Sequence, residues 1–223
     1  MQYRSEIDGL RAIAVISVVL YHAQIIFFDY RLFPGGFLGV DIFFVISGYL
    51  ISSNLYTDLL NTNKINFFDF YERRARRIIP LLFFVILVTF VLSYKYLLPN
   101  QFLEYSQSAT AAIFFSSNIF FYLTNTLYGA ENSLIQPLLH TWSLGVEEQF
   151  YILFPIILFI SFRIIREKLF IVISMLLIIS LIYSNWQSDK NIQLNYLMLA
   201  SRFWELGIGS LIAFYEIKYG KKK

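Results

Sequence analysis

The stretch IIPLLFFVILVTFVLSYKYLL at residues 78–98 is almost entirely apolar, and it decides the fold class. In an α-helix, which rises about 1.5 Å per residue, a run of this length matches the ~30 Å hydrocarbon core of a bilayer. The arginine-rich segment FYERRARR precedes it directly, as charged residues commonly do at the border of a membrane span. This stretch therefore predicts a transmembrane helix.

The same pattern recurs along the chain, in which 57% of the residues are hydrophobic and 15% are charged. Such a composition is far more apolar than that of soluble domains. Residues 105–128 are apolar too, but contain many Ser, Thr and Asn residues, which favours a re-entrant or interfacial helix in an exoplasmic loop. We expect one all-α membrane domain over 1–223, a polytopic transmembrane helix bundle with about six spans: 10–28, 37–57, 78–98, 139–162, 168–185 and 195–216.

The distribution of basic residues supports a non-spanning 105–128, because each added span reverses the orientation of everything after it. With 105–128 outside, most of the 18 Lys and Arg residues lie in segments predicted to be cytoplasmic, together with both termini. The net charge of +3 thus indicates orientation, and we expect no nucleic-acid partner. With no cysteine and two histidines, the chain is expected to use neither a thiolate nor a metal.

Two ionisable residues share one face of the first predicted span. Arg11 and His22 are 11 positions apart, which in a helix is about 20° from three full turns and roughly 16 Å along the axis. This places Arg11 at the cytoplasmic edge and His22 deep in the outer half of the bilayer. Histidine is a common general base, whereas the alternative is a snorkelling arginine and a histidine bonded to a neighbouring helix.

Further candidates lie in the second and third spans. Asp41 is expected about one turn inside the second span, where it either orients His22 or forms a salt bridge or helix cap. Ser47 and Gly48 follow as helix-packing residues. Arg74 and Arg77 are three apart, hence adjacent on one helical face, and arginine forks suit phosphate groups. The alternative is a cluster that only anchors the span to phospholipid.

The fourth and sixth spans also carry polar residues. Glu147 is seven positions from His140, on the same helical face, and Glu148 points about 100° away. Paired carboxylates in an apolar helix are functional candidates. Arg202 and Glu205 are three apart, which predicts a structural ion pair.

Five segments resemble acyltransferase family 3 and follow one another in the same order along nearly the whole chain: EIDGLRAIAVISVVLYH, GGFLGVDIFFVISGYLI, FYERRARRIIP, PLLHTWSLGVEEQFYILFP and SRFWELGIGSLIAF. The resemblance implies a membrane-bound O-acyltransferase of the bacterial cytoplasmic membrane. Such an enzyme takes an acyl group, commonly acetyl from acetyl-coenzyme A, and transfers it to a sugar hydroxyl of a surface polysaccharide, for example an O-antigen lipopolysaccharide. Because family members commonly have more spans, the chain is expected to be truncated at its C-terminus.

The resemblance also implies roles for the polar residues. His22 is expected to act as general base or acyl relay, with Asp41 and Glu147 as further catalytic candidates. The expected ligands of the acyl-coenzyme A phosphates are Arg11, Arg74 and Arg77, and the expected substrate-binding or structural residues are His140, Glu148, Arg202 and Glu205.

Two other functions remain open: a transporter or flippase of an anionic or lipid-linked glycan, and an inactive remnant. Expected partners are membrane lipid, the acceptor glycan and either a second copy or the C-terminal remainder of the protein.

Overall fold

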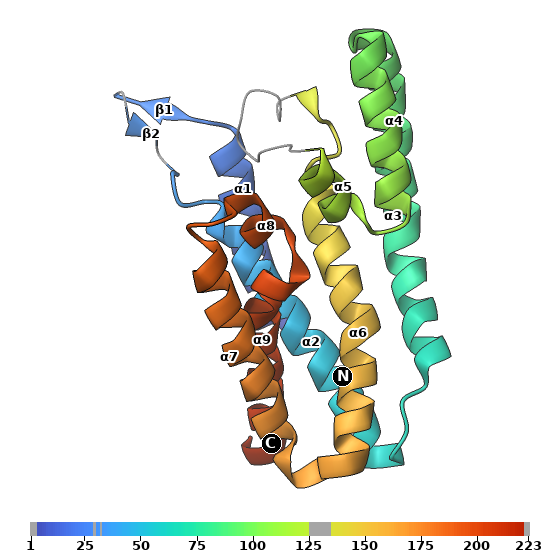
Figure 1. The fold of residues 1–223 in the computed structure, drawn as a ribbon, viewed down its shortest axis with the longest axis vertical. Coiled ribbons are helices and arrows are strands. Elements are labelled where there is room, and N and C mark those ends of the chain that lie inside the picture. Colours follow the sequence, from blue (N-terminus) through green and yellow to red (C-terminus); the bar gives the residue numbers. More distant parts are fainter. Residues whose placement is uncertain (1–3, 29, 32, 125–134, 221–223) are drawn as a thin grey trace. The chain divides into compact units, whose positions relative to one another are not determined.

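The computed structural model describes residues 4–28, 30–31, 33–124 and 135–220 (Figure 1). Helices dominate this part of the chain, and a small antiparallel hairpin of β1 (Ile26–Phe27) and β2 (Tyr30–Arg31) follows the first helix. The chain divides into two compact units. The first unit comprises Met1–Asn63, Leu158–Leu181 and Phe203–Lys223, and the second comprises Lys64–Ile157 and Ile182–Arg202.

The first unit contains α1 (Ser5–His22), α2 (Leu38–Thr62) and parts of α7 (Leu169–Gln187) and α9 (Leu199–Tyr219). Helices α1 and α2 are antiparallel, because Gly36 lies against Ser17 and Gly39 lies against Ala14. The 3₁₀ helix η2 (Arg166–Lys168) leads into α7. Ser180 of α7 accepts a hydrogen bond from the Trp204 backbone of α9.

Helices α2 and α9 approach each other so closely that glycine is required at their contact. A Cβ atom on Gly48 would lie 2.0 Å from the Leu206 carbonyl oxygen, and one on Gly209 would lie 2.0 Å from the Val45 carbonyl oxygen. The Ser52 hydroxyl donates a buried 2.7 Å hydrogen bond to Ser210 across the same contact. Small residues that bring helix backbones together are typical of membrane helix packing. The predicted packing role of Gly48 is therefore confirmed.

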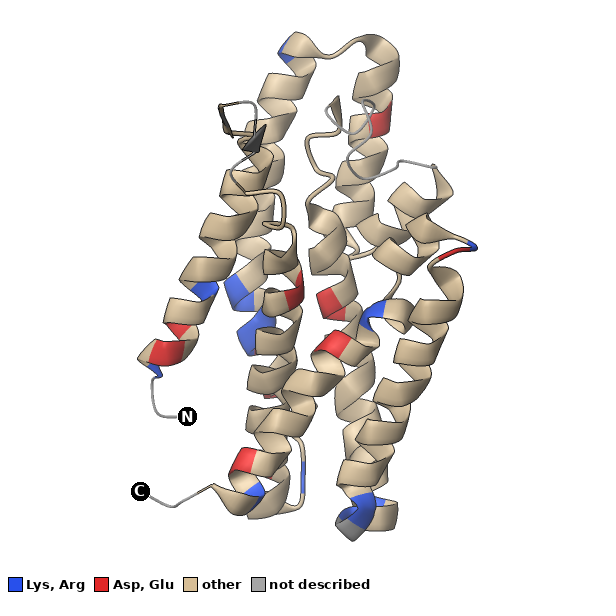
Figure 2. Ribbon diagram, turned by 90° about the vertical axis from the view of Figure 1, so that its left-hand side faces the viewer, with Lys and Arg blue, Asp and Glu red and all other residues tan. Residues whose placement is uncertain are grey.

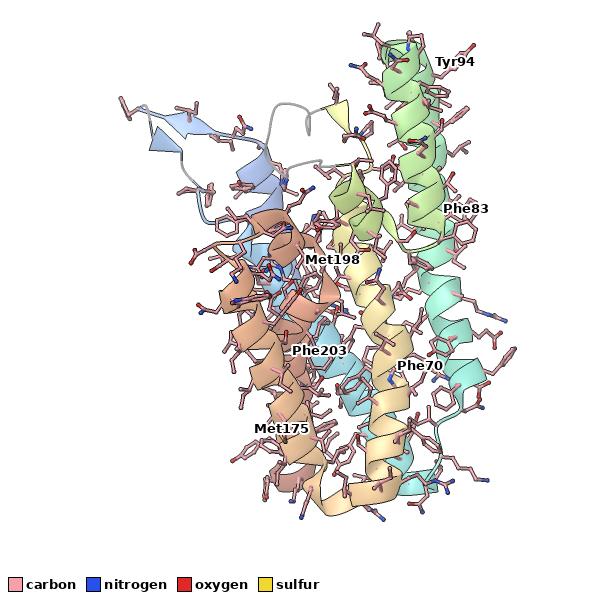
Figure 3. The ribbon with its side chains drawn as sticks, in the orientation of Figure 1. Phe70, Phe83, Tyr94, Met175, Met198 and Phe203 are labelled. Atoms are coloured by element: carbon pink, nitrogen blue, oxygen red, sulfur yellow. The ribbon has the colours of Figure 1, made fainter. Side chains whose placement is uncertain are left out.

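The second unit contains α3 (Phe67–Tyr96), α4 (Pro99–Ile113), α5 (Ser117–Leu123), the first part of α6 (Thr141–Ile165) and α8 (Ile192–Leu197). Helix α3 begins where the Asn66 side chain accepts a hydrogen bond from the Asp69 backbone. Helix α4 folds back along α3, and the Tyr105 hydroxyl donates to the Ile86 carbonyl at 2.8 Å. Phe83 and Tyr94, labelled in Figure 3, are exposed, as expected of side chains that face lipid.

A buried amide network fixes the short helices of the second unit. Asn118 of α5 is fully buried, and its amide donates to the Leu197 carbonyl at 3.0 Å. Gln149 of α6 donates to the Asn118 side-chain oxygen at 2.8 Å. Because buried amides are costly unless they are paired, this network favours a single arrangement of α5, α6 and α8.

Five segments of the described chain are long and apolar enough to cross a membrane: Leu38–Thr62, Phe67–Tyr96, Thr141–Ile165, Leu169–Gln187 and Ile192–Tyr219. They correspond to the last five predicted spans. The predicted first span, 10–28, is wrong in its bounds, because α1 covers Ser5–His22 and the backbone turns into a left-handed conformation at Gln24 (φ 48°). Helix α1 is not among the five, since its 18 residues include three charged ones, Glu6, Asp8 and Arg11.

Residues 105–124 do not form a spanning helix. Helix α4 ends at Ile113 and α5 starts at Ser117, with a left-handed Phe115 (φ 53°) between them; the rest of the predicted 105–128 segment lies outside the described residues. The direction of α9 also indicates that residues 105–128 do not cross the membrane. Gly48 meets Leu206, Ser52 meets Ser210 and Tyr56 meets Phe214, so α2 and α9 are parallel. If the segment 105–128 also crossed the membrane, α9 would be antiparallel to α2.

Candidate active site

His22 is the last residue of α1, and its side chain is exposed. Its Nδ1 atom lies 2.8 Å from the Val18 carbonyl oxygen. Since a carbonyl oxygen only accepts, Nδ1 must carry the hydrogen, and in the neutral ring the Nε2 atom then holds the lone pair. The Tyr21 ring packs edge-on against the imidazole at 5.2 Å. The helix thus orients a histidine so that Nε2 is its basic nitrogen.

The surroundings of His22 differ in part from the prediction. The residue ends its helix instead of lying within a longer span, because α1 stops six residues before the predicted border. Asp41 is half-buried in the first turn of α2. Because Gly36 lies against Ser17 and Gly39 lies against Ala14, the antiparallel packing places Asp41 closer to the level of Ala14, near the middle of α1, than to that of His22. Arg11 lies in the second turn of α1, and its guanidinium is 3.4 Å from the Asp8 carboxylate.

In the second unit, the predicted arginine pair divides into two environments. The Arg74 guanidinium is half-buried and lies 4.3 Å above the centre of the Tyr151 ring of α6. Arg77 is exposed. Although the two residues are three apart on one helix, Arg74 packs between α3 and α6, whereas Arg77 is accessible to a ligand.

Glu148 of α6 is the buried carboxylate beside this arginine. It is 8% exposed, and its Oε1 atom has no hydrogen-bond partner in the part of the chain that the structure describes. The positive charge of Arg74 favours the ionised form of this carboxyl group, whereas the negative charge of Glu147 opposes it. Glu147 is half-buried and accepts a 2.8 Å hydrogen bond from the Tyr151 hydroxyl. Arg74 and Glu147 therefore meet at Tyr151, and the buried Glu148 lies near Arg74. Such an arrangement is able to exchange a proton or orient a polar substrate.

The other predicted residues lie elsewhere. His140 is exposed and precedes α6, which begins at Thr141, so the predicted helical face shared with Glu147 does not extend to it. Arg202 donates to the Tyr196 carbonyl at 3.2 Å and lies 4.8 Å above the Tyr196 ring. Glu205 is buried on α9. The ion pair between Arg202 and Glu205 stays a prediction.

Sequence reasoning missed one polar group of the first unit. Glu216 accepts hydrogen bonds from Arg4 at 2.7 Å and from the Tyr49 hydroxyl at 2.6 Å, and Arg4 also bonds to Tyr49. Tyr49 and Glu216 raise the pKa of the Arg4 guanidinium. No sequence signal links Arg4 to Glu216, because 212 positions separate them. The contact between Glu147 and Tyr151 could have been found from the sequence, since these residues are four apart on one helix.

These features define a helical integral membrane protein that crosses the bilayer several times and carries titratable side chains between its helices. A family model described as an acyltransferase domain matches residues 4–223, and the chain belongs to this acyltransferase family 3.

Curated relatives agree with the family. O-acetyltransferase OatA of Staphylococcus aureus strain NCTC 8325 / PS 47 is 43% identical over 183 residues, and OatA of strains COL and MRSA252 gives the same values. The match covers 81% of this chain and 28% of each relative, so the chain spans less than a third of their length. No solved structure matches it.

Proposed function

We propose that this chain is the membrane part of an O-acetyltransferase that transfers acetyl from acetyl-coenzyme A to a sugar hydroxyl of a cell-surface glycan. Membership of the family and the relatives named O-acetyltransferase support the reaction class. The observation that carries the mechanism is the His22 hydrogen bond to the Val18 carbonyl, since it makes Nε2 the basic nitrogen.

In the proposed reaction, His22 Nε2 accepts the proton of the sugar hydroxyl as the hydroxyl oxygen attacks the carbonyl carbon of the thioester. The new C–O ester bond forms and the C–S bond breaks. The coenzyme A thiolate then takes up one proton and leaves as the thiol. One proton is thus removed from the sugar hydroxyl and one is added to the thiolate, so the reaction is balanced. Asp41, in the first turn of the neighbouring helix α2, is proposed to offset the charge of the imidazolium that forms.

The donor is proposed to bind through arginine. Arg77 is exposed and suits the diphosphate of coenzyme A, whereas Arg74 is held on Tyr151 and positions α3 against α6. Arg11 has the Asp8 carboxylate as a neighbour, which a phosphate would have to displace. We propose that the chain lies in a bacterial cytoplasmic membrane, with the arginines and the N-terminus on the cytoplasmic side.

Membrane vesicles that contain the chain and a lipid-linked glycan test the proposal. Acetyl-coenzyme A labelled with ¹⁴C in the acetyl group is added on the cytoplasmic face, and label is measured in the extracted glycan. Transfer of label supports the O-acetyltransferase. Movement of unlabelled glycan across the vesicle membrane without acetylation would instead identify a transporter, and would refute the proposal.

A further inference from the structure

A wide hollow lies at one end of the first unit, where η2 leads into α7 and α9 ends. Its volume is about 1090 Å³, slightly above the ~300–1,000 Å³ that is typical of small-molecule sites. Buried Leu169 and Phe214 lie at its base together with Tyr56, and the Tyr56 and Phe214 rings are 4.7 Å apart. The exposed lining consists of the side chains of Arg166, Phe170, Ile171, Tyr215, Lys218 and Tyr219.

The hollow is positively charged. Among the described side chains, neither Arg166 nor Lys218 forms an ion pair. Each instead lies over an aromatic ring, Arg166 at 4.8 Å from Phe162 and Lys218 at 5.2 Å from Tyr219. Figure 2 shows further basic residues at the turn between α6 and α7, at the lower end of the ribbon.

None of the acidic side chains that the structure describes in this region belongs to the lining of the hollow. Glu216 accepts hydrogen bonds from Arg4 and Tyr49 and is thereby engaged in another contact. Asp58 is exposed two positions beyond Tyr56 on α2 and is not part of the lining.

An apolar stripe leads away from the hollow along α7. Ile171, Met175 and Ile178 are exposed and follow one another at helical spacing, so they lie on one face; Met175 is labelled in Figure 3. Helix α7 is one of the five helices long and apolar enough to cross the membrane. The stripe therefore runs from the charged end of a span toward the bilayer centre.

We propose that this hollow binds the headgroup of an anionic glycerophospholipid, with the phosphate held by Arg166 and Lys218 and an acyl chain lying along Ile171, Met175 and Ile178. The shape of the site follows the shape of such a lipid, because cations and tyrosines lie at the interface and the apolar face begins directly beside them. A free nucleotide would use the cations but not the apolar stripe. The inference does not depend on the proposed acetyl transfer.

Native mass spectrometry of the purified chain in detergent tests this site, with phosphatidylglycerol and phosphatidylcholine of matched acyl chains as probes. We expect bound phosphatidylglycerol to be retained and phosphatidylcholine to be lost. The double variant Arg166→Gln/Lys218→Gln is expected to weaken phosphatidylglycerol binding about 30-fold, because each cation near anionic lipid contributes a factor of roughly five.

The matched control is Lys95→Gln/Lys190→Gln, which removes two cations that also lie over aromatic rings, at 5.2 and 4.0 Å, outside the hollow. It is expected to bind phosphatidylglycerol as the unmodified chain does, and circular dichroism checks that both double variants fold. Equal binding of the two lipids, or an equal loss in both double variants, would overturn the proposal. Displacement of the bound lipid by micromolar coenzyme A would overturn it too, since the hollow would then be a nucleotide site.

Discussion

Replacing Gly48 by alanine inserts one methyl group where α2 and α9 touch. The new Cβ would lie 2.0 Å from the Leu206 carbonyl oxygen, whereas ordinary contact begins at 3.4 Å. The two backbones must therefore separate locally by about 1.4 Å, because the neighbouring atom belongs to the backbone and has no rotamer to change. The 2.7 Å hydrogen bond between Ser52 and Ser210, one turn further along both helices, would lengthen with them.

Three effects set the magnitude for Gly48→Ala. Overpacking costs about 1–3 kcal/mol. A weakened hydrogen bond between membrane helices adds about 0.6 kcal/mol. Alanine in place of glycine favours the helix by about 1 kcal/mol. We expect a net loss of roughly 0.6–2.6 kcal/mol in the free energy of unfolding.

The assay is unfolding in mixed micelles titrated with sodium dodecyl sulfate and followed by circular dichroism. Two alanine variants serve as controls. A methyl group on Gly9 would meet no described atom within 4 Å, and one on Gly207 would meet its nearest neighbour at an ordinary 3.4 Å. Both variants are expected to be as stable as the unmodified chain or more so. If Gly48→Ala unfolds at the same detergent fraction as Gly9→Ala, the close contact between α2 and α9 is wrong.

Three further predictions follow from the polar contacts. Arg74→Ala is expected to lower the free energy of unfolding by about 1–2 kcal/mol, because the contact with Tyr151 is lost and Glu148 remains buried. Its matched variant Arg77→Ala should leave the free energy of unfolding unchanged and raise the KM for acetyl-coenzyme A roughly tenfold. Asn118→Ala is expected to cost about 1–3 kcal/mol in the same unfolding assay, whereas exposed Gln107→Ala costs nothing measurable. Arg4→Ala is expected to cost at most about 1 kcal/mol, since the side chains of the Arg4–Glu216 pair are 39% and 44% exposed, and the loss should shrink at high salt.

Most of the fold was predictable because long apolar runs in lipid have few alternatives to a helix. Five predicted spans correspond to helices of the structure. The first did not keep its bounds, since apolarity alone continues beyond His22 while the backbone turns at Gln24. The non-spanning character of 105–128 was predicted from its polar residues and from the distribution of basic residues. The break between α4 and α5 at Phe115 was not predicted, because it depends on local backbone conformation that composition does not encode.

Sequence reasoning named candidate residues for the site but few of their contacts. Helical spacing predicted Arg11 and His22 on one face of the first helix, and the spacing of four between Glu147 and Tyr151 also allows the contact that the structure shows. It gave no reason for Arg74 to be half-buried and Arg77 exposed, because that difference comes from α6, which is distant in sequence. The contact of Arg4 with Tyr49 and Glu216 was hidden for the same reason.

The central claim is that His22 Nε2 removes the proton of the acceptor hydroxyl. The most direct measurement is the rate of labelled acetyl transfer by His22→Asn in membrane vesicles, because the asparagine amide is still able to donate to the Val18 carbonyl but lacks the basic nitrogen. Exposed Ser5→Ala, at the start of the same helix, is the control. We predict a rate lower by about 10²–10⁴-fold at unchanged stability. A His22→Asn rate equal to that of Ser5→Ala would contradict the mechanism.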